Sequence, residues 1–77
     1  MRNRSQRMAE LGAALGDVRA QLADAGPITY NALIIAIDRA KATNDLAVLV
    51  SAASAVLELT RHVKGGAIEK LRRTVKL

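Results

Sequence analysis

The sequence predicts an all-α protein, a three-helix bundle built on an αα-hairpin and followed by a short basic amphipathic helix. Three observations lead to this fold class. Apolar residues recur at helical spacing through most of the chain, Gly, Pro and Asn interrupt the pattern at three places, and the segment 46–57 carries no charge. We expect a single helical domain over residues 1–77, with helices at about 5–25, 29–41, 45–63 and 67–76.

Length and composition limit the size of the core. The chain has 77 residues, no cysteine and one aromatic residue, and many of its apolar residues are alanine. A domain of this size buries only about two thirds of the surface that its unfolded chain exposes, and alanine adds little buried volume. Because disulfides cannot supplement this core, we expect self-association to do so, and we predict a homodimer.

The first predicted helix carries a regular apolar row. Five apolar residues are spaced 3, 4, 3 and 4 apart, as in the seam of a coiled coil. They are Met8, Leu11, Leu15, Val18 and Leu22. We assign this row to the interface with a second copy or another partner. Gly12 and Gly16 lie beside it, either to let another backbone approach closely or as tolerated glycines. Gly26 and Pro27 end the helix.

The second predicted helix has one apolar face and one apolar residue off that face. On a helical wheel the face is formed by Tyr30, Leu33, Ile34, Ile37 and Ala40. Ile35 points elsewhere, and it is either an isolated surface residue or part of a second contact surface. The short break at 42–44 makes this helix an antiparallel neighbour of the next one, which gives the αα-hairpin.

The third predicted helix is apolar around more than half of its circumference. Its polar residues fall within an arc of roughly 100° at 100° per residue. They are Ser51, Ser54, Glu58, Arg61 and His62. The apolar remainder is wide enough to contact both other helices and another chain, so we assign Val50 and Leu57 to an interface together with Ile35. We expect the polar arc to be the only side of this helix that faces water.

Positive charge is concentrated after residue 60. Residues 61–77 contain six Lys or Arg and one Glu, whereas residues 1–60 contain six charges of each sign. We assign the six cations to contacts with phosphates or with an acidic partner. They are Arg61, Lys64, Lys70, Arg72, Arg73 and Lys76. The segment 67–76 is too short to be a stable helix alone, so it either docks onto the bundle or folds on a partner.

The residue inventory argues against catalysis. A catalytic nucleophile needs a base and a group that orients the base, whereas Ser54 and His62 lie about 12 Å apart along a helix axis. With one histidine and no cysteine, a metal site would lack its usual ligands, and no glycine-rich phosphate-binding loop is present. We therefore predict no enzyme activity, no cofactor, no metal and no small-molecule substrate.

Charged residues interrupt every apolar segment before it reaches the roughly 18–20 residues needed to span a membrane. We expect a cytoplasmic protein that does not act at a membrane.

Two functions fit these features. The first is a small non-catalytic interaction module, of the adaptor or inhibitor type, that binds and modulates another protein as a homo-oligomer. The alternative is a basic dimeric DNA- or RNA-binding accessory or regulatory protein that contacts phosphates through its termini. A helix-turn-helix is disfavoured, because the segment 45–63 would be the recognition helix and offers Ala, Val and Leu to the bases. No motif identifies the partner.

Overall fold

The computed structural model describes residues 3–76, and four α-helices account for most of this range. They are α1 (Arg4–Ala25), α2 (Asn31–Thr43), α3 (Leu46–Leu59) and α4 (Gly66–Lys76). Residues 3–76 contain no strand, so the predicted all-α class is confirmed. The radius of gyration is 11.5 Å, and a folded chain of this length is expected to have about 11.5 Å.

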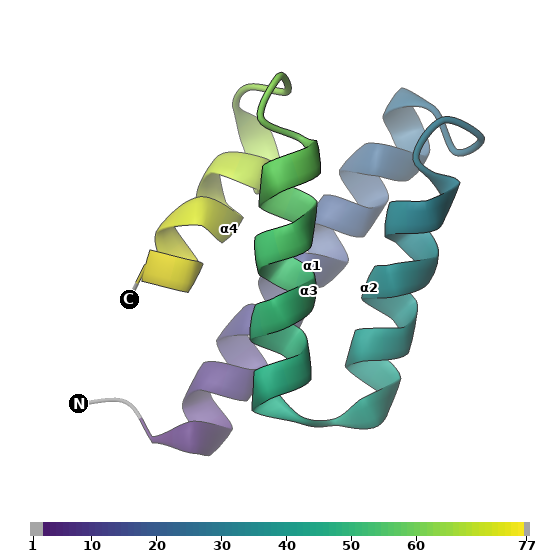
Figure 1. Ribbon diagram of the computed structural model, residues 1–77. Helices are drawn as coiled ribbons and strands as arrows, with labels where there is room; N and C mark the ends of the chain where they lie inside the picture. The colour runs from purple at the N-terminus through teal and green to yellow at the C-terminus, as the bar shows by residue number, and fades with distance from the viewer. Residues whose placement is uncertain (1–2, 77) are drawn as a thin grey trace.

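Figure 1 shows α3 between α2 and α4, with α1 crossing behind α3. The helix α3 packs against each of the other three, and α1 packs against each of them as well. The sequence pattern predicted the need for a third neighbour of α3, and within the chain α4 takes that place.

Local side-chain bonds fix where α1 begins and ends. Asn3 and Gln6 form a capping box, in which the Asn3 side chain accepts the Gln6 N–H and the Gln6 side chain accepts the Asn3 N–H. The helix therefore starts at Arg4, one residue before the predicted start at about 5. At the other end the Gly26 N–H donates to the Leu22 carbonyl, and Pro27 prevents further helix.

The connections on either side of α2 are short. The Tyr30 N–H donates to the Gly26 carbonyl at 3.0 Å, so the chain makes a turn first and α2 starts at Asn31 instead of 29. At the other end Asn44 adopts a left-handed conformation with φ of 53°. The Asp45 carboxylate then accepts the Ala47 N–H at 2.8 Å and caps α3.

The core draws aliphatic side chains from all four helices. Its fully or nearly fully buried members are Leu11, Ala14, Leu15, Val18, Leu22, Ile34, Ile37, Ala40, Leu49, Ala53, Val56, Ile68 and Leu71. The heptad row of α1 supplies four of them. That row is buried by the chain's own helices, because three of those helices pack on one side of α1.

The helix α4 docks onto the other three, which decides between the two alternatives left open by its sequence. Ile68 and Leu71 are fully buried. The Gln21 side chain of α1 accepts the Ala67 N–H at 2.8 Å and so caps the start of α4 from another helix. Gly65 and Gly66 have φ of 78° and 64°, and a Cβ at Gly66 would lie 2.8 Å from Gln21 Oε1. The left-handed φ favours glycine at both positions, and a side chain at Gly66 would also displace the Gln21 amide that caps α4.

The third helix ends at Leu59, four residues before the predicted boundary at 63. Thr60 is fully buried, and its hydroxyl donates to the Val56 carbonyl at 2.6 Å. The Val63 N–H then donates to the Thr60 carbonyl and turns the chain toward α4. No helix between residues 3 and 76 is both long and apolar enough to cross a membrane.

Candidate interaction surfaces

The apolar row of α1 does not form a surface of the folded chain. Leu11, Leu15, Val18 and Leu22 are at most 1% exposed, and Met8 is partly buried against the same core. This placement differs from the interface role predicted for the row. A heptad pattern reports that one side of a helix is covered, and it does not distinguish cover from the same chain and cover from another.

The three other residues predicted at an interface differ in their exposure. Val50 and Leu57 of α3 are partly buried and pack against the core. Ile35 of α2 is 41% exposed, as its position off the apolar face of the helix predicted.

A shallow groove between α2 and α3 was not predicted. It has a volume of about 330 Å³ and is lined by small and mostly uncharged side chains, namely Ala36, Arg39, Ala40, Thr43, Val48, Ser51, Ala52 and Ala55. Val48 is 38% exposed, and Leu59, one turn beyond Ala55 on α3, is 62% exposed. We call this feature, with Leu59 included, the α2–α3 groove.

The expectation that only the polar arc of α3 faces water is therefore wrong. Val48, Ala55 and Leu59 are also exposed, on the side of α3 that borders α2. The excessive width of the apolar arc was the available signal, because a helix with neighbours on three sides still leaves part of such an arc uncovered.

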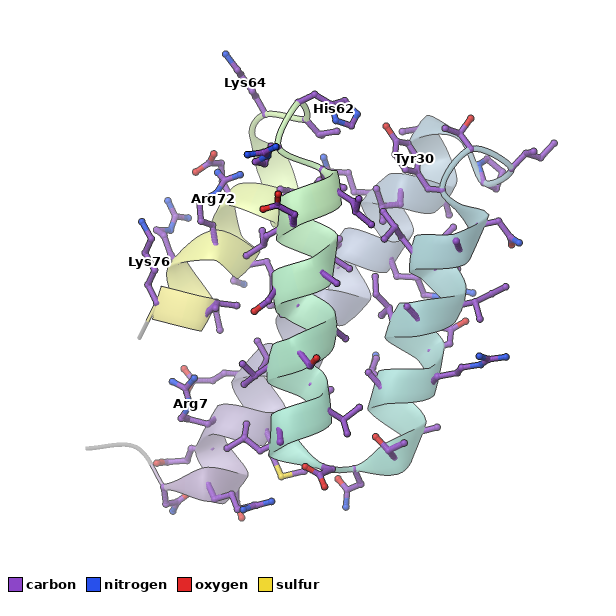
Figure 2. All side chains as sticks on the ribbon, viewed as in Figure 1. Arg7, Tyr30, His62, Lys64, Arg72 and Lys76 are labelled. Atoms are coloured by element: carbon purple, nitrogen blue, oxygen red, sulfur yellow. The ribbon has the colours of Figure 1, made fainter. Side chains whose placement is uncertain are left out.

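Three cations of the C-terminal part lie on one side of the molecule. Figure 2 shows Lys64, Arg72 and Lys76 on the side of α4 that faces away from α2, with Arg7 of α1 below them. Since Ile68 and Leu71 face the core, the charged residues of α4 are directed to solvent or to its flanks. We call Arg61, Lys64, Lys70, Arg72, Arg73 and Lys76 the basic surface.

Two of these six cations already have acidic neighbours. Arg72 pairs with Glu69 one turn earlier on α4, and Arg61 lies 3.6 Å from Glu58. Within residues 3–76 the other four have no ion pair, and all four are exposed. They are Lys64, Lys70, Arg73 and Lys76.

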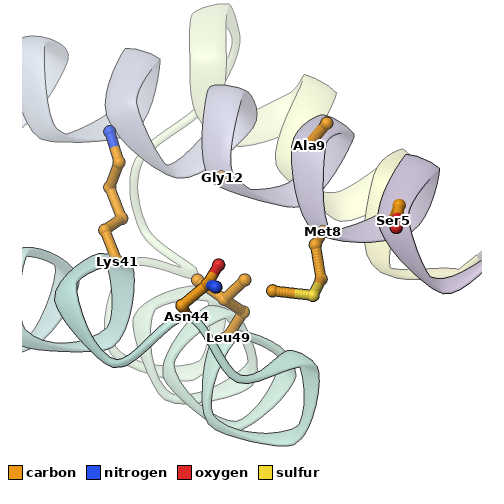
Figure 3. A pocket seen from close by; sticks show the side chains of 7 residues that line it. All are labelled: Ser5, Met8, Ala9, Gly12, Lys41, Asn44 and Leu49. Carbon is orange, nitrogen blue, oxygen red and sulfur yellow. The ribbon is translucent and has the colours of Figure 1, made fainter.

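A second depression, of about 370 Å³, lies between the first half of α1 and the α2–α3 connection (Figure 3). Residues of α1, among them Met8 and Gly12, line one side, and Lys41, Asn44 and Leu49 line the other. The Lys41 Nζ lies 3.0 Å from the position that a Cβ would take at Gly16, whereas a Cβ at Gly12 would have no neighbour within 4 Å. No backbone in the described part of the chain comes that close to either glycine.

Arg19 of α1 and Asp38 of α2 form an ion pair with two hydrogen bonds. Within residues 3–76 it is the one ion pair between two helices. The Arg19 Nε donates to one carboxylate oxygen at 2.7 Å and a terminal nitrogen donates to the other at 3.2 Å. These hydrogen bonds, with the charge of Arg19, hold the pKa of Asp38 below its usual value and raise the pKa of Arg19. The pair is exposed and joins the outer sides of α1 and α2.

One further polar contact joins the start of α2 to the chain after α3. The Tyr30 hydroxyl lies 3.3 Å from His62 Nε2, at the end of the molecule where α3 ends and α2 begins. Over residues 3–76 no three His, Asp or Glu side chains are close enough together to hold a metal ion.

The four helices, the α2–α3 groove and the basic surface define a small helical domain with two different exposed surfaces. Comparisons with protein-family models, with curated proteins and with solved structures find no match for this chain.

Proposed function

We propose that this protein is a small non-catalytic interaction module that acts as a homo-oligomer in the cytoplasm and binds another protein through its basic surface. In this proposal α2, the connection Asn44–Asp45 and α3 form an αα-hairpin that helps to hold α1 and α4 in place. The observation that carries the proposal is the distribution of charge. Residues 61–77 contain six cations and one Glu, whereas residues 1–60 contain equal numbers of positive and negative charges.

The docking of α4 supports this role for the cations. Gln21 caps the start of α4, and Ile68 and Leu71 anchor its apolar side, so the cations project from a helix that is already folded. A preformed helix loses less conformational entropy on binding than a disordered basic tail would. An excess of positive charge on one side also steers an acidic partner toward that side and raises the association rate.

A protein partner fits the basic surface better than a nucleic acid does. Glu58 and Glu69 lie within this surface, each beside an arginine. A protein surface can offer cations to match these two carboxylates, whereas a phosphate backbone offers only negative charge. The surface also lacks an aromatic side chain on which a base could stack, since Tyr30 is bonded to His62 elsewhere.

Binding to DNA or RNA is the second candidate function. Four unpaired cations of the basic surface favour it: Lys64, Lys70, Arg73 and Lys76. Such a contact would be made to phosphates and would depend little on sequence. With four phosphates neutralised, the logarithm of the binding constant should fall with the logarithm of salt concentration at a slope of about −3.6.

One experiment separates the two candidates. Immobilised wild-type protein is exposed to a lysate of its native cells, with and without nuclease, at about 50 and about 200 mM salt. A variant with Lys70→Gln, Arg73→Gln and Lys76→Gln tests the basic surface. A control with Arg4→Gln, Arg19→Gln and Lys41→Gln removes the same charge outside both the basic surface and the α2–α3 groove.

We expect a protein that is retained by the wild type and the control, withstands nuclease and is lost with the triple α4 variant. Retention of nucleic acid, lost with the same variant and at the higher salt concentration, would favour the second candidate. Equal retention by the α4 variant and the control would contradict both.

A further inference from the structure

The α2–α3 groove has no cover within the chain, and its α3 wall has a regular composition. Four residues line up along α3 at spacings of 4, 3 and 4, which places them on one side of the helix. They are Val48, Ala52, Ala55 and Leu59. The two larger side chains stand exposed at the ends of the row. The alanines between them line the groove, together with Ala36 and Ala40 of α2.

The sizes of these side chains are symmetric about the middle of the row. The order is large, small, small, large, whether α3 is followed forward or backward. Two copies of α3 packed antiparallel around a two-fold axis at the middle of the row would bring Val48 opposite Leu59 of the second copy. The same axis would bring Ala52 opposite Ala55 of the second copy. Small residues at the centre allow two helices to approach closely, while the larger ones cover the ends.

We propose that the α2–α3 groove is a homodimer interface in which α3 of a second copy packs antiparallel to α3. A two-fold interface uses the same surface on both copies, so it requires a surface that complements itself. The symmetric row meets that requirement, whereas a foreign partner would impose no symmetry on it.

The two ends of α3 favour the same orientation. Asp45 caps the start of the helix, and His62 lies just after its end, where its ring contacts Tyr30. An antiparallel pair places the start of each α3, with its Asp45 carboxylate, beside the end of the other, so the positive end of each helix dipole lies beside the negative end of its partner. A parallel pair would place Asp45 beside Asp45 and the like ends of two dipoles together.

This dimer leaves α4 exposed. The groove lies between α2 and α3, while the basic surface lies on the other side of α3, on α4 and the loop before it (Figures 1 and 2). Each dimer would therefore present two basic surfaces. The proposal rests on the homo-oligomer of the proposed function and assigns its interface, and it does not depend on the binding of an acidic protein.

Sedimentation equilibrium of the purified chain tests the dimer and the face that it uses. The wild type should have twice the chain mass of 8.2 kDa. Ala55→Glu places a carboxylate at the centre of the interface, and it should weaken self-association at least tenfold. Ala13→Glu makes the same change at an exposed position of α1 and should have no effect. Circular dichroism checks that both variants are folded, because both alanines are exposed in the monomer.

Single cysteines test the orientation, since the natural chain has none. A mixture of Val48→Cys and Leu59→Cys proteins should form a mixed disulfide dimer under mild oxidation. Neither variant should cross-link efficiently with itself, because residues 48 and 59 are about 16 Å apart along the helix axis. Self-linked Val48→Cys would show a parallel pair and overturn the proposed packing.

A monomeric wild type would overturn the proposed dimer, and so would a dimer that is unaffected by Ala55→Glu. Neither result bears on the basic surface, whose test measures loss of a partner from the triple α4 variant.

Discussion

The outer side of α4 and the α2–α3 groove differ in the free energy of removing them from water. The basic surface keeps its cations hydrated and gains from contact only when an opposite charge replaces that water. The groove exposes Val48, Leu59 and alanines, for which removal from water is itself favourable. The difference suggests separate roles, since an apolar, symmetric face suits a permanent contact with a second copy and a charged face suits a steered, salt-sensitive contact with another molecule.

Truncation of a leucine to alanine should show the difference between α4 and the groove most strongly. Leu71 of α4 is fully buried, and Leu71→Ala should lower the free energy of unfolding by about 2–5 kcal/mol. Leu59→Ala, at the edge of the groove, should change it by less than about 0.5 kcal/mol in the monomer. Urea unfolding measures both, with each change made in an Ala55→Glu background so that dimerisation does not contribute. Equal losses would mean that Leu59 is buried within the chain.

Replacement of two glycines by alanine should give the next largest difference in stability. Gly66→Ala forces a side chain onto a residue with φ of 64° and against Gln21, so it should destabilise the protein by roughly 1–3 kcal/mol. Gly12→Ala meets no neighbour within 4 Å and adds helix propensity, so it should stabilise by roughly 0.5–1 kcal/mol.

Thermal unfolding measures both glycine variants. Because Gly66 holds the start of α4, its variant should also speed amide exchange in α4 more than in α2. Uniform exchange across all helices would argue that α4 is not a separately anchored element.

The Arg19–Asp38 pair should give the smallest effect. The pKa of Asp38 is lowered in the folded chain, so the pair stabilises the fold above the unfolded pKa of about 3.9 and this stabilisation is lost as pH falls through the folded value. Between about pH 6 and about pH 3, wild type should lose slightly more stability than Asp38→Asn. The control is Asp24→Asn, which removes a carboxylate without an ion pair in residues 3–76, and it should follow the wild type. Identical pH profiles for all three would show that the pair is not formed in solution.

The sequence predicted the helical elements well because their periodicity and their breaks are local. The C-terminal end of α1 followed from Gly26 and Pro27, and the start of α4 lies one residue before the predicted 67. The boundary of α3 was misplaced because the chain turns after Leu59, where the Val63 N–H donates to the Thr60 carbonyl, and the pattern of apolar residues does not show this turn.

Surfaces were harder to predict than elements. The exposure of Ile35 followed from one helical wheel, but the burial of Leu15 and the exposure of Leu59 depend on which helices lie on each side. In particular, the cap that Gln21 provides for α4 links residues 46 positions apart. Periodicity alone carries no information at that distance.

The central claim is that the apolar groove pairs two copies while the basic surface stays free. Sedimentation equilibrium of the wild type from about 50 mM to about 1 M salt tests it most directly, because salt screens exposed charges and does not weaken apolar contact. We predict a mass near twice 8.2 kDa at every salt concentration. A mass that falls to that of one chain as salt rises, or a single-chain mass throughout, would contradict the account.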